Sequence, residues 1–381
     1  STQLGVDMQK KVLIVDDSAL MRRVLSDIIN SDNRFCVSKI VSNGLEALNL
    51  LIRDKKEFDA IILDINMPIM GGIEFLKELG IRKINATVIV VSTMAKEGAK
   101  ETIQALELGA FDFVTKPESF LDVKSNRFRD KIIQTLTVAT NSSKCKIKSF
   151  ITEEADLDKK AQPIYPKQQP QTLTVIENNH QSKSPMGQGK NKLIAIACST
   201  GGPKALQKIV PLLPENLGCS VLIVQHMPEG FTQSLANRLN ETSKLKVKEA
   251  EHGEILQKGV VYIAKGGYHM RLTNLGNGVH NITVTKEEAR NGLRPCADIM
   301  YESLADTNFD EIICVVLTGM GSDGTRGIKL LHEKKNIYVI AQDEATSTVY
   351  GMPKVIRDAG LVNEVLPLEQ IAGAIRKNMG D

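Results

Sequence analysis

The sequence predicts an α/β protein with two doubly wound parallel-sheet domains that a polar linker joins. Three observations lead to this prediction. Apolar runs of strand length alternate with helix-like segments over residues 11–138, and the same alternation returns from residue 191 onward. Between them, residues 139–190 are polar and contain prolines, with too few apolar residues to build a core. The chain has 381 residues, which suffice for two domains.

The first domain is expected to contain five strands that alternate with helices. The predicted strands cover residues 11–17, 35–42, 58–65, 86–93 and 111–117, and the predicted helices cover residues 18–29, 44–51, 72–79, 96–108 and 128–138. Strands that alternate with helices form a parallel sheet, because each helix carries the chain back across it. Ligands of such sheets bind beyond the carboxyl ends of the strands.

Polar residues stand at those carboxyl ends. Asp16 and Asp17 end the first strand, Asp64 ends the third, Ser92 ends the fourth, and Lys116 follows the fifth. Three carboxylates on one edge repel each other unless a cation neutralises them, and oxygen ligands with open positions suit Mg²⁺ beside a phosphoryl group. Helix capping and a solvated lysine would explain each residue separately. They do not explain why all five stand at strand ends.

The second domain repeats the α/β pattern with a different edge. Core parallel strands are predicted at residues 192–197, 219–225, 312–318 and 337–342. Period-2 stretches and glycines over residues 244–287 predict an antiparallel β excursion at one edge of the sheet.

Ser199 follows the first of these strands, in the segment IACSTGG. A serine at a sharp strand-to-helix turn projects from the sheet edge, near helix-terminal amides that can hold an oxyanion. A plain turn or a phosphate-binding loop is the alternative. Cys198 is a rival nucleophile, but successive strand residues point to opposite faces, so we expect a buried thiol there.

Two partners for this serine follow later strands. His226, in VQHMP, follows the second strand, and Asp323, in LTGMGSDG, follows the third. Parallel neighbouring strands would bring both to the edge that carries Ser199, where an imidazole can take the serine proton and a carboxylate can orient the imidazole. Alternatively, His226 is an ordinary histidine at a strand end, and Asp323 caps the helix that starts near Thr325.

Composition excludes several classes of protein. The net charge of +3, the absence of Trp and the aromatic content of 4% argue against a nucleic-acid surface. No apolar run approaches the roughly 20 residues that span a bilayer, so we expect no direct membrane insertion. The six cysteines are scattered without C-x-x-C spacing, which argues against disulfides or zinc and favours a cytoplasmic protein.

Residues 11 to about 125, which include the motifs VDD, LDINMPIMGG, VVST and VTKP, resemble the receiver domain of two-component response regulators. The resemblance implies a Mg²⁺ cofactor and a phosphorylated aspartate. The implied roles are Mg²⁺ ligation by Asp16, Asp17 and Asp64, phosphorylation of Asp64, contact with the phosphoryl group through Ser92 and Lys116, and an aromatic switch at Phe113.

Across both domains, the chain resembles the chemotaxis protein-glutamate methylesterases, which are response regulators with a C-terminal esterase. The further motifs are IACSTGG, VQHMPEGFT, GGYHMRL, RPCADIMYES, LTGMGSDG and AQDEATSTVYGMPK. The implied site comprises the triad Ser199, His226 and Asp323, an oxyanion donor at the Met320 backbone amide, and Thr200 and His269 lining the site. Arg294 could orient an acidic substrate region, and a surface salt bridge is the alternative.

The resemblance implies hydrolysis of glutamyl methyl esters on the cytoplasmic helices of chemoreceptors, with methanol released, and deamidation of receptor glutamines. A chemotaxis histidine kinase would be the phosphodonor, and the esterase site would need no cofactor. We expect the receiver at residues 10–135, the linker at 136–190 and the esterase at 191–381. A catalytically weak scaffold that binds receptors is one alternative. A DNA-binding effector is another, but it would need a basic recognition helix in a compact helical unit.

Overall fold

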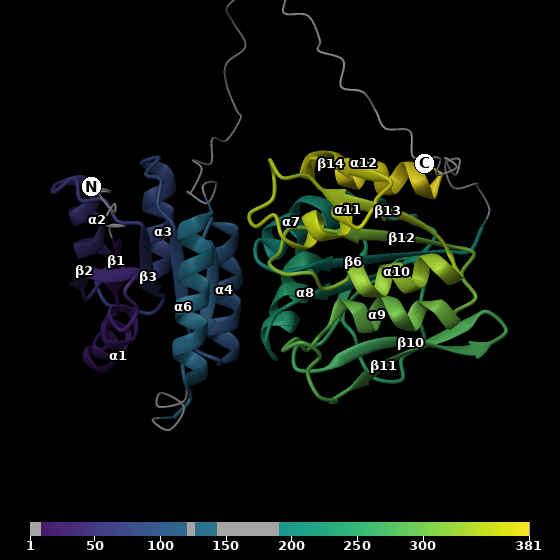
Figure 1. Cartoon of the computed structure of the whole chain (residues 1–381), viewed down its shortest axis with the longest axis horizontal. Helices are drawn as coiled ribbons and strands as arrows, with labels where there is room; N and C mark the ends of the chain where they lie inside the picture. The colour runs from purple at the N-terminus through teal and green to yellow at the C-terminus, as the bar shows by residue number, and fades with distance from the viewer. Residues whose placement is uncertain (1–8, 120–125, 143–189, 381) are drawn as a thin grey trace, which may run out of the picture.

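The computed structural model describes residues 9–119, 126–142 and 190–380, which form two α/β domains side by side (Figure 1). The first contains a five-stranded parallel sheet, and the second contains a seven-stranded parallel sheet with a separate antiparallel pair. The predicted fold class is therefore confirmed.

The sheet of the first domain has the strand order β2-β1-β3-β4-β5. Helices cover both faces of this sheet, so its central strands are apolar on both sides, and every residue of β3 and β4 is buried. The strands are β1 (Lys10–Val15), β2 (Phe35–Val41), β3 (Ala60–Asp64), β4 (Val88–Ser92) and β5 (Asp112–Thr115). The helices are α1 (Ala19–Asn30), α2 (Gly44–Ile52), α3 (Gly72–Ile81), α4 (Lys96–Glu107) and α6 (Asn126–Asn141).

The large sheet of the second domain has the order β14-β13-β12-β6-β7-β9-β8, with every strand parallel to its neighbours. The strands are β6 (Lys192–Cys198), β7 (Ser220–Gln225), β8 (Lys246–Glu249), β9 (Val260–Ile263), β12 (Glu311–Val316), β13 (Asn336–Gln342) and β14 (Glu364–Leu366). The helices are α7 (Gly202–Ile209), α8 (Phe231–Thr242), α9 (Ala297–Ser303), α10 (Thr325–Lys334), α11 (Met352–Asp358) and α12 (Leu368–Met379), with 3₁₀ turns η1 (Val210–Leu212) and η2 (Leu304–Asp306).

The excursion over residues 244–287 differs in part from the expectation. Its second half forms the antiparallel pair β10 (His269–Gly276) and β11 (Val279–Thr285), as predicted. Its first half instead adds β8 and β9 to the edge of the main sheet in parallel. A period-2 pattern indicates a half-buried strand but does not fix the direction of its partner, which explains the difference.

The order of the large sheet creates a crevice at one edge. From β6 the chain moves to β7 on one side, and it later returns to β12 on the other side. Ligands of doubly wound sheets bind where the order reverses in this way, beyond the carboxyl ends of the strands. The first domain faces this edge: α4 packs against α7 and α8, and one hydrophobic cluster contains residues of both domains.

The described residues cover only the ends of the predicted linker. Helix α6 continues to Asn141, beyond the expected start of the linker at residue 136, whereas residues 143–189 lie outside the described part. The predicted domain boundaries stay a prediction.

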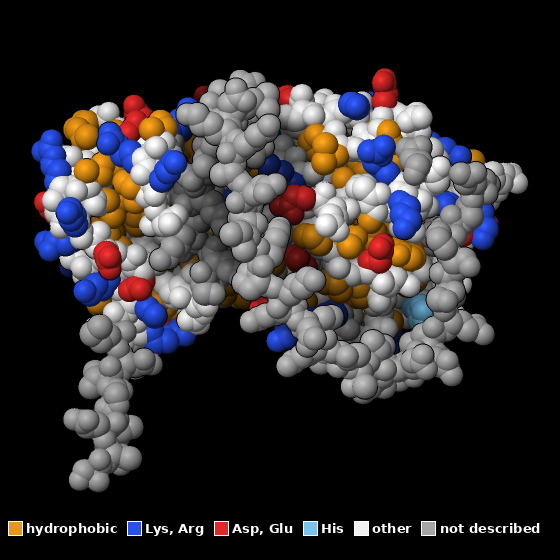
Figure 2. Space-filling view, turned by 90° about the horizontal axis from the view of Figure 1, so that it is seen from above, with side chains coloured by type: hydrophobic (Ala, Val, Ile, Leu, Met, Phe, Trp, Pro, Cys, Tyr) orange, Lys and Arg blue, Asp and Glu red, His pale blue; other side chains and the backbone are white. Residues whose placement is uncertain are grey.

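In the described part, no helix is long and apolar enough to cross a membrane. The face in Figure 2 carries basic and acidic side chains interspersed with hydrophobic ones.

Candidate active site

An acidic cluster lies at the carboxyl ends of β1 and β3. Asp16, Asp17 and Asp64 each offer one carboxylate oxygen, and these oxygens lie within 4.8 Å of one another. Lys116 Nζ lies 2.9 Å from Asp64 Oδ1 and 3.4 Å from Asp16 Oδ2. Asp16 Oδ2 is buried and has no hydrogen-bond partner among the described residues. A hard cation that keeps several waters, such as Mg²⁺, fits this set of ligands.

Burial and repulsion make this cluster unfavourable without a cation. Burial raises the pKa of Asp16, and the charge of Asp64 raises it further, while Lys116 opposes both effects. Burial also raises the pKa of Asp64, again against the influence of Lys116. Burial alone would lower the pKa of Lys116, but its contacts with Asp64 and Asp16 outweigh burial and raise it. The contacts of Lys116 favour its charged form, and protons or a metal ion would relieve the remaining repulsion among the carboxylates.

Ser92 ends β4, and its hydroxyl is hydrogen-bonded to α4. Thr102 Oγ1 donates to Ser92 Oγ at 2.7 Å, and Ser92 Oγ donates to the Gly98 carbonyl at 3.1 Å. Thr102 is completely buried. Because α4 packs against the second domain, this pair of hydroxyls joins the end of β4 to a helix that contacts the second domain. Sequence reasoning missed Thr102, which carries no motif of its own.

Phe113, the predicted switch residue in β5, lies in the contact between the domains. Its ring stacks on Phe231 of α8, with centroids 4.7 Å apart and an angle of 21° between the planes. Nearby, Glu107 Oε1 accepts hydrogen bonds from Arg238 Nε at 2.8 Å and from Gln207 Nε2 at 2.9 Å. The contact therefore combines an apolar stack with charge-assisted hydrogen bonds.

Ser199 stands at a sharp turn between β6 and α7. Its N–H donates to the Thr318 carbonyl at 3.0 Å, and its own carbonyl accepts from the Gly202 N–H at 2.7 Å. Gly201 has a φ of +82°, in the left-handed region that favours glycine. A Cβ on Gly319 would lie 2.7 Å from Ser199 Cβ, so the loop after β12 passes directly beside the serine because it has no side chain there.

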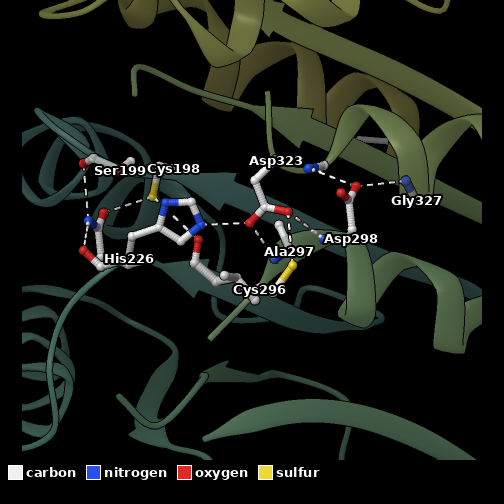
Figure 3. Close-up of polar contacts among 11 residues, drawn as sticks. Cys198, Ser199, His226, Cys296, Ala297, Asp298, Asp323 and Gly327 are labelled. Atoms are coloured by element: carbon white, nitrogen blue, oxygen red, sulfur yellow. Dashed lines mark hydrogen bonds and ion pairs between the residues drawn. The ribbon is translucent and has the colours of Figure 1, made fainter. Parts of the chain in front are cut away.

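His226 and Asp323 meet at the same edge of the sheet. His226 Nε2 lies 2.6 Å from Asp323 Oδ2, and the imidazole lies between Ser199 and Asp323 in Figure 3. If Nε2 carries the proton shared with the carboxylate, Nδ1 is left as the proton acceptor. Ser199 Oγ makes no hydrogen bond to His226 among the described residues, and such contacts often tighten only when substrate binds.

Four donors fix the Asp323 carboxylate. Oδ2 accepts from the Ala297 N–H at 2.6 Å as well as from His226, and Oδ1 accepts from the Asp298 N–H at 2.9 Å and from Cys296 Sγ at 3.2 Å. Burial alone would raise the pKa of Asp323, but His226 and the two backbone donors lower it to about 2. The carboxylate is therefore ionised and can orient the imidazole and stabilise its charged form.

Asp298 makes the reciprocal contact. Its Oδ1 accepts from the Gly324 N–H at 2.9 Å and from the Gly327 N–H at 2.7 Å. Asp323 thus satisfies backbone donors at the start of α9, while Asp298, from α9, satisfies those at the start of α10. The carboxylate next to the start of α10 thus caps α9, and the carboxylate at the start of α9 caps α10. Asp298 lies in the motif RPCADIM, but its capping role depends on packing that the motif does not reveal.

Unpaired backbone N–H groups lie next to Ser199. Among the described residues, the N–H groups of Met320 and Thr200 donate to no other group. Thr200 follows the serine in the chain, and Met320 follows Gly319, which packs against the serine. Backbone donors in such a place can hold an oxyanion.

Cys198 is a buried thiol, as predicted. It is inaccessible to solvent, its Sγ donates to Gln225 Oε1 at 3.0 Å, and burial raises its pKa. A thiol that resists ionisation is a poor nucleophile. Gln225 Nε2 also donates to the carbonyls of Ser199 at 3.0 Å and His226 at 3.3 Å, so it joins the ends of β6 and β7. Sequence reasoning missed Gln225, whose only signal was its place directly before His226.

Ser199, His226 and Asp323 line a cavity of about 620 Å³ between the two domains. The first domain contributes Asp112 to its wall, and Thr200 Oγ1 donates to Asp112 Oδ2 at 2.9 Å. Burial raises the pKa of Asp112. The first domain therefore contacts the residue next to the serine and covers one side of the site.

The remaining two candidates differ in position. His269 is buried at the start of β10, with its Nε2 2.8 Å from the Glu288 carbonyl, and it does not line the cavity. Arg294 does line it, and its Nη1 donates to the Glu287 carbonyl at 2.7 Å. The structure thus places Arg294 in the same cavity wall as Ser199, His226 and Asp323 and leaves His269 outside it.

Comparisons with known proteins match both domains. Residues 12–125 match the response regulator receiver domain, and residues 194–375 match the CheB methylesterase family. A protein-glutamate methylesterase/protein-glutamine glutaminase from Halalkalibacterium halodurans is 42% identical, with 96% of this chain and 97% of that protein covered. A protein of the same name, numbered 1, from Syntrophomonas wolfei is 39% identical, with 95% and 97% covered. The crystal structure of the Thermotoga maritima CheB methylesterase catalytic domain is 42% identical, covers 49% of this chain and 97% of that one, and has a TM-score of 0.47.

Proposed function

This chain belongs to the CheB methylesterase family, with an N-terminal response regulator receiver domain, and from that membership we propose that it hydrolyses glutamyl methyl esters on chemoreceptors. The names of its relatives also include protein-glutamine glutaminase, so the proposal extends to receptor glutamines. The observation that carries the proposal is the convergence of Ser199, His226 and Asp323 on one cavity, with 2.6 Å between the imidazole and the carboxylate.

In the first half-reaction, Ser199 Oγ attacks the ester carbonyl carbon while His226 Nδ1 takes the hydroxyl proton. Asp323, ionised, keeps the imidazole in the required tautomer and stabilises its positive charge. The tetrahedral oxyanion accepts hydrogen bonds from backbone N–H groups, for which Met320 and Thr200 have free donors. When the intermediate collapses, the C–O bond to the methoxy group breaks, and methanol leaves with the proton from His226.

In the second half-reaction, water attacks the acyl-enzyme carbonyl and His226 takes its proton. The bond to Ser199 Oγ breaks, the serine recovers its proton from His226, and the substrate is released as a glutamyl carboxylate. A glutamine side chain forms the same acyl-enzyme, with ammonia leaving in place of methanol. None of these steps calls on the acidic cluster of the receiver.

The identity of the nucleophile can be tested by covalent trapping. A fluorophosphonate, applied with a phosphodonor and Mg²⁺ present, should attach to the peptide that contains Ser199, and methanol release should fall in parallel. Cys198→Ser is the matched control and should be labelled like the wild type, whereas Ser199→Ala should not be labelled and His226→Gln should react far more slowly. Labelling of another residue, or labelling without loss of methanol release, would refute the assignment.

The receiver is proposed to take a phosphoryl group on Asp64. Asp16, Asp17 and Asp64 would hold Mg²⁺, which when bound neutralises their repulsion and the charge of an incoming phosphoryl group. Lys116 adds a fixed positive charge at 2.9 Å from the Asp64 carboxylate. The phosphodonor would be a chemotaxis histidine kinase, and the esters would lie on the cytoplasmic helices of chemoreceptors.

Phosphorylation is proposed to control access to the cavity. In the arrangement described here, Asp112 and Phe113 of the receiver contact Thr200 and Phe231 of the esterase, which hinders a bulky helical substrate. A phosphoryl group on Asp64 would attract the Ser92 hydroxyl away from α4, and α4 and Phe113 form the contact between the domains. Phosphorylation would thereby shift the population towards an open form.

An Asp64→Asn variant tests this control. It should retain the unstimulated rate of methanol release and gain nothing from a phosphodonor, because the acceptor carboxylate is lost. Strong stimulation of the variant would contradict the proposal. No methanol release by the wild type under any condition would instead favour the receptor-binding scaffold.

A further inference from the structure

Arg294 lies in the wall of the cavity that contains Ser199 and His226. Its Nη1 is anchored on the Glu287 carbonyl at 2.7 Å. A guanidinium has five N–H donors in a rigid plane, so this anchor holds the side chain in place and leaves other donors available. Among the described residues, Arg294 forms no ion pair. The alternative that Arg294 belongs to a surface salt bridge is therefore not supported.

Other arginines of the same region have acidic partners. Arg271 pairs with Glu287, and Arg290 Nη1 contacts both carboxylate oxygens of Glu302, at 2.7 and 2.8 Å. These pairs neutralise the charge of both side chains locally. Arg294 has no such acidic partner among the described residues and lies with its positive charge in the cavity wall.

The other charged groups that line the cavity form no ion pair with Arg294 among the described residues. Asp323 and Asp298 are already occupied by backbone donors. Asp112 and Lys131 also line the cavity, but both belong to the receiver, and Lys131 acts electrostatically on Asp112. When the receiver moves away, these two charges leave with it, and Arg294 remains as a cation beside the triad.

We propose that Arg294 is a specificity-determining residue that binds the carboxylate of an acidic side chain next to the methyl ester on the substrate. This inference rests on the proposed esterase function. The ester is neutral and offers no charge to a cation, whereas a neighbouring glutamate or aspartate offers two oxygens in the geometry of the guanidinium fork. On a helical substrate, residues three or four positions from the ester lie on the same face. The enzyme therefore selects esters in acidic surroundings.

The test measures KM and kcat for methanol release from methylated receptor membranes, with a phosphodonor and Mg²⁺ present. One receptor keeps its acidic residues, and a second has alanine at the acidic positions within four residues of the ester. On the acidic receptor, Arg294→Gln should raise KM roughly tenfold with kcat almost unchanged, and Arg294→Lys should recover part of the loss. On the alanine receptor, KM should be the same for the wild type and Arg294→Gln.

Arg290→Gln is the matched control, because it removes one positive charge from the same region outside the cavity wall. Its KM should remain that of the wild type. An unchanged KM in Arg294→Gln would overturn the inference, as would an equal rise on both receptors, a fall in kcat alone, or the same rise in Arg290→Gln. Absence of methanol release by the wild type is a different result, which refutes the proposed function itself.

Discussion

Removal of the Asp298 carboxylate should damage both the fold and the catalytic geometry. In Asp298→Ala, the Gly324 and Gly327 N–H groups at the start of α10 lose their acceptor. A lost helix cap costs about 0.5–2 kcal/mol, and each buried donor left unpaired costs about 1–3 kcal/mol. Relief of the repulsion between Asp298 and Asp323 offsets part of this cost. We expect a net loss of about 2–3 kcal/mol in the free energy of unfolding.

The same substitution should lower kcat, because Asp323 lies two residues before the first residue of α10 and a shifted helix start moves its carboxylate. A displacement of about 1 Å at a reacting group can cost about 100-fold in rate, so we expect a fall of about 10-fold to 100-fold. The measurements are chemical denaturation and methanol release at neutral pH. They should be made on the full chain with a phosphodonor and Mg²⁺ in the activity assay.

Asp298→Asn is the matched control. Both glycine N–H groups donate to Oδ1, so an amide oxygen in the same place can accept both bonds while the negative charge is lost. We expect stability within about 0.5 kcal/mol of the wild type and little change in kcat. An Asn variant as damaged as the Ala variant would refute the capping argument in favour of a requirement for charge. An undamaged Ala variant would refute the argument altogether.

Three further outcomes are expected. Phe113→Ala removes the stack on Phe231, which is worth about 0.5–1.5 kcal/mol, from the form in which the two domains are docked. Methanol release without phosphodonor should therefore rise about 2-fold to 10-fold. An unchanged rate would exclude a role for the stack in docking. The pKa values of Asp16 and Asp64 are raised in the folded protein, so stability without metal should decline as pH rises from the ordinary range of these pKa values through the raised range. Mg²⁺ should therefore increase Tm more at pH 8 than at pH 5. Equal increases in Tm at the two pH values would contradict this linkage. Cys198→Ser should keep esterase activity, and iodoacetamide should not inactivate the folded wild type; rapid inactivation prevented by that substitution would show that the thiol is reactive.

The central strands of both parallel sheets could be predicted because helices bury them on both faces, so that their apolar runs are nearly continuous. The direction of β8 and β9 could not be predicted from a period-2 pattern, which is the same for a parallel edge strand and an antiparallel one. β14 has three residues and only partial burial, too little for a periodic signal.

The polar residues at strand ends could be predicted as neighbours because parallel strands bring their carboxyl ends to one edge. Asp112 could not be predicted at the esterase site, since its contact with Thr200 depends on how two separate domains dock. Asp298 and Gln225 were likewise missed, because their roles depend on which backbone groups packing leaves without a partner. The motif that suggested His269 reflects similarity in sequence, whereas burial at the start of β10 keeps that side chain out of the cavity wall.

In the proposed mechanism, Ser199 performs ester hydrolysis under the control of the receiver. The most direct measurement is methanol release from methylated receptor membranes by the wild type and by Ser199→Ala, each with and without a phosphodonor and Mg²⁺. We predict slow release by the wild type, faster release with the phosphodonor, and none by Ser199→Ala in either condition. Release that survives in Ser199→Ala, or wild-type release that the phosphodonor leaves unchanged, would contradict this mechanism.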